Sequence, residues 1–337
     1  MRFALGCGCA AAVQPLILKP ASAVVLSPLM PEPKTTWSDS GFANEMASGM
    51  SDYERFLSPL KAALFADVAG SVLELGLGTG PSLRYYGAAR NVVGVEPNLA
   101  MHPLAQASAH AAGLDNRFSL VTGNAEQLPF EDASFDTVVG ASCLRARMRG
   151  AASCAQRARA DAFARYLRTA ETMVLCSVRD VAASLREARR VLRPGGKLLF
   201  IEHVAAPAGT PLRAMQVWPV ARAEQPKRIC MRPELTRGAA PLQSTLDPLQ
   251  AAFFCGCHLA RDPSAALERA GFSSLNTARF SLGDRRVMAA ASSSRGGTDA
   301  VAAVRAAAAD AGVGWQLGTP PPPHFLLSPH LVGVATA

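Results

Sequence analysis

VLELGLGTGPSL, residues 72–83, runs an apolar strand directly into three glycines spaced two residues apart. Glycines after a buried strand let the backbone approach a ligand closely, because no Cβ stands in the way. The dinucleotide fingerprint GxGxxG would need a third glycine where Pro81 stands, and the phosphate loop GxxxxGK[ST] would need a lysine after Gly80. The stretch therefore predicts a ligand without a pyrophosphate.

Strands and helices alternate along the surrounding chain. Expected strands are 71–75, 92–96, 118–122, 135–141 and, after the turn 193–196, 197–204. Expected helices are 53–65, a short one from residue 82, 99–112 and 181–192. Such alternation predicts right-handed βαβ units in an α/β, doubly wound, mostly parallel sheet with helices on both faces. A ligand should then bind outside the carboxyl ends of the strands.

Acidic side chains end the first two expected strands. Glu74 precedes the glycines, and its charge would repel a phosphate and attract an ammonium group. Glu96 ends the second strand, where such folds hydrogen-bond the hydroxyls of a ribose. The polar turn 123–130 after the third strand offers groups that read an adenine edge. A ribose, an adenine and a cationic amino-acid tail together indicate S-adenosylmethionine.

Five ordered motifs resemble those of class I S-adenosylmethionine-dependent methyltransferases: 74–80, 95–98, 124–130, 134–136 and 192–196. Within that superfamily the chain is most similar to the methyltransferase-like 7 (thiol S-methyltransferase) group, at 175–178, 200–205, 246–248, 257–259, 267–272 and 328–333. The resemblance implies a Rossmann-like sheet of seven strands whose last strand is antiparallel. It also implies S-adenosylmethionine as the cofactor.

The resemblance and the strand ends together assign a set of residues to the cofactor: Glu74, Gly76, Gly78, Gly80, Glu96, Pro97, Asn98, Asn124, Ala125, Glu126, Ser142 and Cys143. Asn124 stands where many relatives carry an acid, so the backbone of Ala125 is an alternative partner for the adenine. For Ser142 and Cys143, a role in the site and plain packing are equally favoured. His203 and Asp247 are the catalytic candidates, against the alternatives of a packed histidine and an ordinary turn before Pro248.

A soft nucleophile suits this predicted site. A sulfonium methyl is already activated, so the protein mainly aligns the acceptor and excludes water. A thiol has a pKa of about 8.5 and needs little help to ionise. We therefore expect a small thiol or sulfide as acceptor, with His203 assisting. Alternatives are a C- or O-methyltransferase of a quinone, sterol or other lipid-like acceptor, a binder of S-adenosylmethionine without turnover, and a dinucleotide oxidoreductase, against which Pro81 argues.

Domain boundaries follow from changes in composition. Residues 1–40 read as a targeting or flexible segment, because 1–31 carry no acid and 21–23 fit a small-residue cleavage site. Residues 41–337 read as the methyltransferase domain, interrupted near 145–172, 217–243 and 284–324 by insertions of low-complexity texture without a periodic apolar face. We expect an organelle, a plastid before the endoplasmic reticulum or another membrane-associated compartment, and peripheral membrane association.

Charge and cysteine content predict neither a nucleic-acid partner nor a metal. The net charge of +8 is concentrated in 145–171 and 219–243, and the remainder is close to neutral. The eight cysteines lack the spacing of a zinc site or a disulfide framework. The one cluster, 255–258, favours loop packing over a metal. The expected partner is a small-molecule methyl acceptor.

Overall fold

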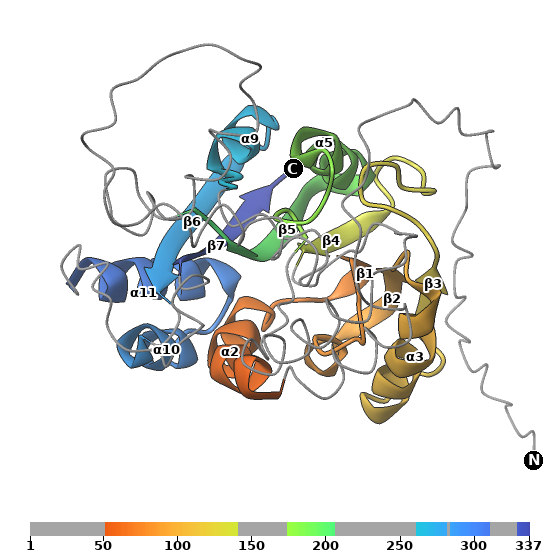
Figure 1. Cartoon of the computed structure of the whole chain (residues 1–337), viewed down its shortest axis with the longest axis horizontal. Helices are drawn as coiled ribbons and strands as arrows, with labels where there is room; N and C mark the ends of the chain where they lie inside the picture. Colours follow the sequence, from red (N-terminus) through yellow and green to blue (C-terminus); the bar gives the residue numbers. More distant parts are fainter. Residues whose placement is uncertain (1–50, 141–173, 206–260, 282–283, 311–328) are drawn as a thin grey trace, which may run out of the picture.

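The computed structural model describes residues 51–140, 174–205, 261–281, 284–310 and 329–337. They form one seven-stranded sheet in the order β3-β2-β1-β4-β5-β7-β6 (Figure 1). The strands are β1 (Gly70–Leu75), β2 (Ala89–Val95), β3 (Phe118–Val121), β4 (Phe135–Gly140), β5 (Leu192–His203), β6 (Ser274–Ser281) and β7 (Pro329–Thr336). The first five pair in parallel, whereas β7 pairs antiparallel with both β5 and β6. The predicted doubly wound sheet with an antiparallel last strand is confirmed.

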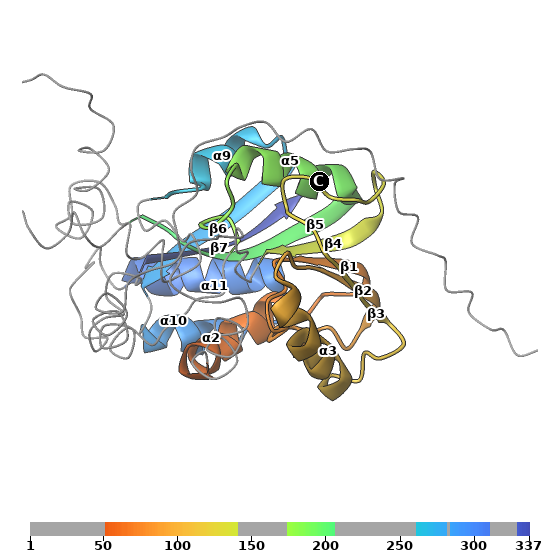
Figure 2. The same cartoon turned by 45° about the vertical axis from the view of Figure 1, so that its right-hand side comes forward.

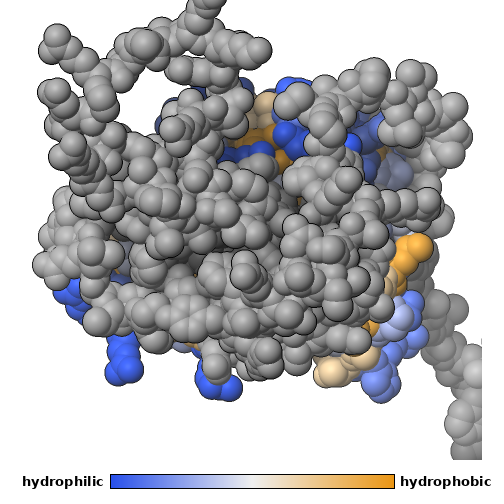
Figure 3. All heavy atoms as spheres, in the orientation of Figure 1, coloured by the Kyte–Doolittle hydropathy of each residue, from blue (hydrophilic) through white to orange (hydrophobic). Residues whose placement is uncertain are grey.

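Helices cover both faces of the sheet (Figure 2). One face carries α5 (Val181–Val191) and α9 (Ser264–Arg269), and the other carries α2 (Ser51–Leu64), α3 (His102–Ala111), α10 (Arg285–Ser292) and α11 (Gly297–Asp310). Two short 3₁₀ helices, η1 (Leu83–Tyr85) and η2 (Leu99–Met101), follow β1 and β2. Two apolar clusters result, one beneath each helical layer. In the orientation of Figure 1, hydrophilic residues make up much of the described surface that is visible (Figure 3).

Local sequence explains the central strands and the helix that follows β4. All residues of β1 after Gly70 are buried, as expected for a parallel strand covered on both faces. Gly94 in β2 leaves room for Leu77, because a Cβ at Gly94 would lie 2.5 Å from Leu77 Cδ2. Asp180 caps α5 by accepting the N–H of Ala183 at 2.9 Å.

The segment 284–324 corrects one expectation. We expected no apolar face there, yet α10 and α11 lie within it and bury side chains from Val287, Met288, Ala291, Val301 and Val304 in the core. Alanine has the highest helix propensity, and its small side chain lets a helix pack closely, so an alanine-rich stretch is a core helix here.

The start of β5 is a second difference. We expected a turn at 193–196 before the strand, but β5 begins at Leu192. The irregularity is instead a register shift in its pairing with β4, between Phe135 and Thr137. Gly195 takes a positive φ of 77° at this point, which glycine adopts without strain.

Several expectations fall outside the described residues. These are the targeting segment 1–40, the insertions 145–172 and 217–243, the cysteine cluster 255–258, and Ser142, Cys143 and Asp247. Among the helices that the structure describes, none has the length and apolar character needed to cross a bilayer.

Candidate functional site

The glycine turn after β1 presents open backbone at Gly78 and close packing at Gly80. Gly76, Gly78 and Gly80 have φ values of 60°, 59° and 78°, which strongly favour glycine. Among the described residues, a Cβ at Gly78 would meet only the Gly76 carbonyl oxygen, at 4.0 Å, so this part of the structure leaves space for a ligand beside Gly78. A Cβ at Gly80 would lie 3.2 Å from Ser108 Cβ and 3.4 Å from Ala105 Cα. Gly80 therefore lets the turn pack on α3.

Glu96, one residue past β2, holds the glycine turn by its carboxylate. The N–H of Gly78 donates to Glu96 Oε2 at 2.9 Å, and the N–H of Asn98 donates to Glu96 Oε1 at 2.8 Å. Burial raises the pKa of Glu96 to about 7, against the lowering effect of these two hydrogen bonds. The turn after β1 and the turn after β2 are thus joined through one carboxylate.

Asn98 and Leu99 offer two further groups beside Glu96. Asn98 Oδ1 accepts the N–H of Ala100 at 3.0 Å, while Nδ2 is buried and has no hydrogen-bond partner among the described residues. A buried donor of this kind is costly unless a ligand satisfies it. The Leu99 side chain is 66% exposed, which is a large fraction for an apolar side chain next to a polar turn. From the sequence, Leu99 is expected only as the start of a helix. Pro97 between them is half-buried.

Glu74, at the end of β1, is fully buried next to Tyr86. Burial, followed by the negative charge of Glu74, raises the pKa of Tyr86 well above its ordinary value. The two side chains come from elements on either side of the glycine turn. No local pattern predicts Tyr86, because its contact with Glu74 forms only when the glycine turn folds back.

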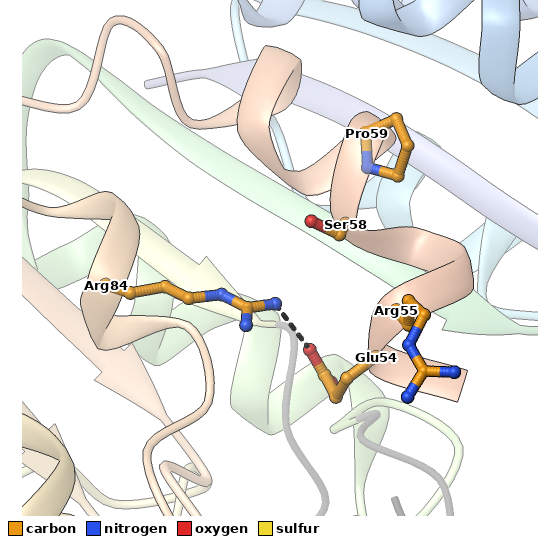
Figure 4. Close-up of a pocket in the computed structure, with 5 residues that line it drawn as sticks. All are labelled: Glu54, Arg55, Ser58, Pro59 and Arg84. Atoms are coloured by element: carbon orange, nitrogen blue, oxygen red, sulfur yellow. Dashed lines mark ion pairs between the residues drawn. The ribbon is translucent and has the colours of Figure 1, made fainter. Parts of the chain in front are cut away.

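A pocket lies between α2 and η1, on the α2 side of this turn. Its volume is about 380 Å³, and Figure 4 shows Arg84 reaching toward Glu54, with 3.8 Å between Nη2 and Oε2. Glu54 also accepts from buried Lys61 at 2.6 Å. The lining residues are Glu54, Arg55, Ser58, Pro59 and Arg84. Charged side chains therefore border the cleft on the side of Glu74.

The turn after β3 is held from α5. Glu187 Oε2 accepts the N–H of Leu128 at 2.8 Å, and Arg190 donates to the carbonyl oxygens of Phe130 at 2.8 Å and Leu128 at 3.2 Å. Arg190 and Glu187 are also paired with each other, at 2.6 Å. On the sequence these two residues look like an ordinary solvated pair on a helix, so their role was not predicted.

The predicted adenine-side residues take different positions in this turn. Asn124 is exposed and forms an isolated bridge with Gln127, whereas Ala125 is buried. Glu126 is half-buried, and its Oε1 accepts the N–H of Arg179 at 2.8 Å. Glu126 therefore links this turn to the segment before α5.

Glu202 and His203 end β5 and are both buried. The Glu202 carboxylate accepts the N–H groups of Val174, Leu175 and Cys176 at 3.1, 2.9 and 3.3 Å. Burial raises the pKa of Glu202 to about 8 despite these bonds.

His203 faces His330 of β7, with ring centroids 5.5 Å apart. Burial and the neighbouring His330 lower the pKa of His203 well below its ordinary value. A neutral, buried imidazole of this kind is a weak base, so these features favour packing over proton transfer for His203.

The donor set fits S-adenosylmethionine. Glu74 offers a carboxylate to an ammonium group, Glu96 and Asn98 offer an acceptor and a buried donor to a ribose, and Gly78 leaves the backbone open. Within the described ranges, no group of three or more His, Cys, Asp or Glu side chains could hold a metal ion. The chemistry of these residues suits a cationic nucleoside.

Comparison with known proteins shows what part of the chain is similar to. Residues 72–160 match the model of the methyltransferase domain family. The chain contains a class I methyltransferase domain. The cofactor of this methyltransferase family is S-adenosylmethionine.

The curated relatives include enzymes with two kinds of acceptor. Human thiol S-methyltransferase TMT1A is 30% identical over 214 residues, which are 63% of this chain and 64% of TMT1A. Mouse thiol S-methyltransferase TMT1B is 35% identical over 143 residues, 42% of this chain and 45% of TMT1B. The ubiquinone/menaquinone biosynthesis C-methyltransferase UbiE of Hahella chejuensis is 31% identical over 136 residues, 39% of this chain and 41% of UbiE. The chain thus spans less than two thirds of the length of each of these relatives.

Proposed function

We propose that this methyltransferase transfers a methyl group from S-adenosylmethionine to the sulfur of a small thiol. The observation that carries the proposal is the joined cleft, in which the Glu96 carboxylate binds the N–H of Gly78 at the carboxyl ends of β1 and β2. The sequence similarity to two thiol S-methyltransferases supports sulfur as the acceptor atom.

Each side of the cleft has one task toward the cofactor. Glu74 pairs with the ammonium group of the amino-acid tail, and Glu96 accepts from the ribose hydroxyls while Asn98 Nδ2 donates to them. The backbone at Ala125 serves the adenine, and exposed Leu99 offers it an apolar surface. When bound, S-adenosylmethionine supplies a methyl group already activated by the positive sulfonium.

The acceptor chemistry requires little from the protein. A thiol with a pKa of about 8.5 is a few per cent thiolate near neutral pH, and the thiolate is the reactive nucleophile. The bond from the acceptor sulfur to the methyl carbon forms as the bond from the methyl carbon to the sulfonium breaks, and the thiol proton goes to water. Because His203 is a weak base, this route needs no proton transfer to it. The protein contributes alignment and exclusion of water.

A second candidate is methylation at carbon of a quinone-like or sterol-like acceptor. The similarity to UbiE over 136 residues favours it. Carbon or oxygen attack needs a stronger base than a neutral, buried His203 provides. The thiol proposal is therefore the simpler match to the described residues.

A methyl-transfer assay separates these candidates. Full-length protein is incubated with labelled S-adenosylmethionine and a panel of alkyl thiols, phenols and prenylated quinones, with the Glu74→Gln variant as control. We expect label in thioethers from the wild type and little from the variant. Label in a quinone product but in no thioether contradicts the thiol acceptor, and cofactor binding by calorimetry without any product identifies a binder without turnover.

We further propose that residues 1–40 direct the protein to an organelle, a plastid first, and that it associates peripherally with a membrane. The apolar, acid-free composition of 1–31 supports this. A fluorescent fusion to residues 1–40 that stays diffuse in a plant or algal cell contradicts the plastid proposal, and protein that is not released from membranes by carbonate contradicts peripheral association.

A further inference from the structure

The turn 174–178 is held from both sides by two polar side chains. On one side, the Glu202 carboxylate accepts three successive N–H groups, from Val174 to Cys176. On the other side, Arg261 Nη1 donates to three carbonyl oxygens, those of Leu175 and Cys176 at 3.1 Å each and that of Val178. The guanidinium of Arg261 is charged, and hydrogen bonds of a charged group are about twice as strong as neutral ones, so the two attachments together fix the backbone of the turn.

The turn 174–178 lies at the edge of the sheet where the parallel strands have their carboxyl ends. Glu202 and His203 end β5, and the N–H of Ala205 donates to the Arg261 carbonyl oxygen at 2.9 Å, so Arg261 lies beside this strand end. One residue beyond the turn, Arg179 donates its N–H to Glu126 after β3. The segment 174–179 therefore runs along the edge where ligands bind in open α/β sheets.

A second clamp of the same design holds the neighbouring turn. Glu187 accepts the N–H of Leu128, and Arg190 donates to the carbonyl oxygens of Leu128 and Phe130. That turn contains Ala125 and belongs to the cofactor side of the cleft. Each turn is thus held by one carboxylate on its N–H groups and one guanidinium on its carbonyl oxygens.

We propose that Glu202 and Arg261 are positioning residues for the methyl acceptor, because they hold the turn 174–178 as one wall of the acceptor site. The inference rests on the proposed methyl transfer. Neither side chain touches the cofactor or reacts. They act through the backbone of the turn, whereas Glu187 and Arg190 act in the same way on the cofactor side.

The experiment uses matched variants of the two clamps in the full-length protein. Glu202→Gln removes one acceptor oxygen and introduces an amide that cannot satisfy three N–H donors, and Arg261→Met removes the donors while keeping an unbranched apolar stem. Arg190→Met is the matched control in the other clamp. Measurements are the KM for the thiol acceptor, kcat, and the dissociation constant for S-adenosylhomocysteine by calorimetry.

Opposite patterns are expected from the two clamps. Glu202→Gln and Arg261→Met should raise the acceptor KM about tenfold, with the dissociation constant for S-adenosylhomocysteine within about twofold of wild type. Arg190→Met should raise that dissociation constant and leave the acceptor KM near wild type. Arg261→Lys should recover only part of the acceptor KM, because the lysine side chain is one atom shorter and holds its ammonium group farther from the three carbonyl oxygens. Equal changes in both constants, or an unchanged acceptor KM in folded Glu202→Gln protein, would overturn the inference.

Hydrogen exchange tests the clamp separately from turnover. Peptides covering 174–178 should exchange faster in Glu202→Gln than in wild type, and peptides covering 128–132 should not. If the wild type methylates no thiol and yet shows this pattern, the proposed function fails while the clamp stands. If the exchange of 174–178 is unchanged in Glu202→Gln, the clamp itself is wrong.

Discussion

Three alanine substitutions at glycines with similar backbone conformation test whether the cofactor lies on Gly78. Gly78, Gly80 and Gly113 have φ values of 59°, 78° and 67°. Alanine in this left-handed region costs about 1–2 kcal/mol in each case. What differs is the space around the added methyl group, so the series separates backbone strain from packing and from ligand contact.

The structure gives the expected magnitude at each position. At Gly113 no atom of the described residues lies within 4 Å of the added Cβ, so Gly113→Ala measures strain alone, about 1 kcal/mol of unfolding free energy. At Gly80 the Cβ would lie 2.8 Å from Leu83 Cδ1 and would crowd Ser108 and Ala105 of α3, which adds about 1–3 kcal/mol for overpacking. At Gly78 the nearest atom that the structure describes is 4.0 Å away, so Gly78→Ala should lose no more stability than Gly113→Ala.

Cofactor affinity should respond differently from stability, with the largest loss in Gly78→Ala rather than in Gly80→Ala. The methyl group at Gly78 would occupy space at the open backbone, where we place S-adenosylmethionine, and a loss of about 1–3 kcal/mol in binding is about five- to 150-fold in the dissociation constant. Gly113→Ala and folded Gly80→Ala should bind close to wild type. Urea unfolding gives the stabilities, and calorimetry with S-adenosylhomocysteine gives the affinities. Wild-type affinity in Gly78→Ala would refute the placement of the cofactor on this turn.

Three other predictions concern buried charge and packing. Binding of S-adenosylmethionine should release a proton near pH 7 and tighten as the pH rises toward 7, because ribose hydroxyls donate to the ionised form of Glu96, whose pKa is about 7 without ligand. Calorimetry in two buffers of different ionisation enthalpy measures the number of protons released. Equal proton release from Glu96→Gln would contradict this prediction. Lys61→Met should lower the free energy of unfolding in urea by about 3–5 kcal/mol, since it leaves the Glu54 carboxylate buried without its ion-pair partner Lys61. The double variant with Glu54→Gln should regain much of this stability. A decrease below about 1 kcal/mol in Lys61→Met would contradict the buried pair. Gly333→Ala should lower the free energy of unfolding by about 1–3 kcal/mol, because a Cβ at this position overlaps the ring of Phe200. Adding Phe200→Leu to the same chain should recover part of this stability. Additive losses of stability in the double variant would contradict the overlap.

The parts of the site that the sequence predicts are local in the chain. A buried run ending in Glu74, followed by alternate glycines, specifies the strand and the turn without knowledge of distant residues. Glu96 was predicted from the same logic, since the end of a second parallel strand lies beside the end of the first. The fold followed from the alternation of strands and helices, which sets the topology almost alone.

The parts that the sequence did not predict depend on contacts between remote residues. Glu187 and Glu202 bind backbone N–H groups 59 and 28 residues away, at Leu128 and Val174, and no local pattern encodes such a partner. Glu126 was assigned to the cofactor from its position in a motif, yet its carboxylate binds the N–H of Arg179. The expectation of no apolar face in the segment that forms α10 and α11 was wrong for a different reason. Alanine-rich composition resembles low complexity, although alanine favours helices.

One construction recurs around the cleft, in which buried or half-buried carboxylates accept backbone N–H groups, and Glu187 pairs with Arg190 as well. Glu96 binds Gly78 and Asn98, Glu202 binds the turn 174–178, and Glu187 binds Leu128. A pair of opposite charges on the surface is screened by salt, whereas hydrogen bonds of a buried carboxylate to the backbone are screened much less. The turns that face the cofactor and the acceptor should therefore keep their shape over a wide range of ionic strength. The same construction explains why an amide is a severe replacement at these positions, since it keeps the size of the carboxylate but turns one acceptor into a donor that faces another donor.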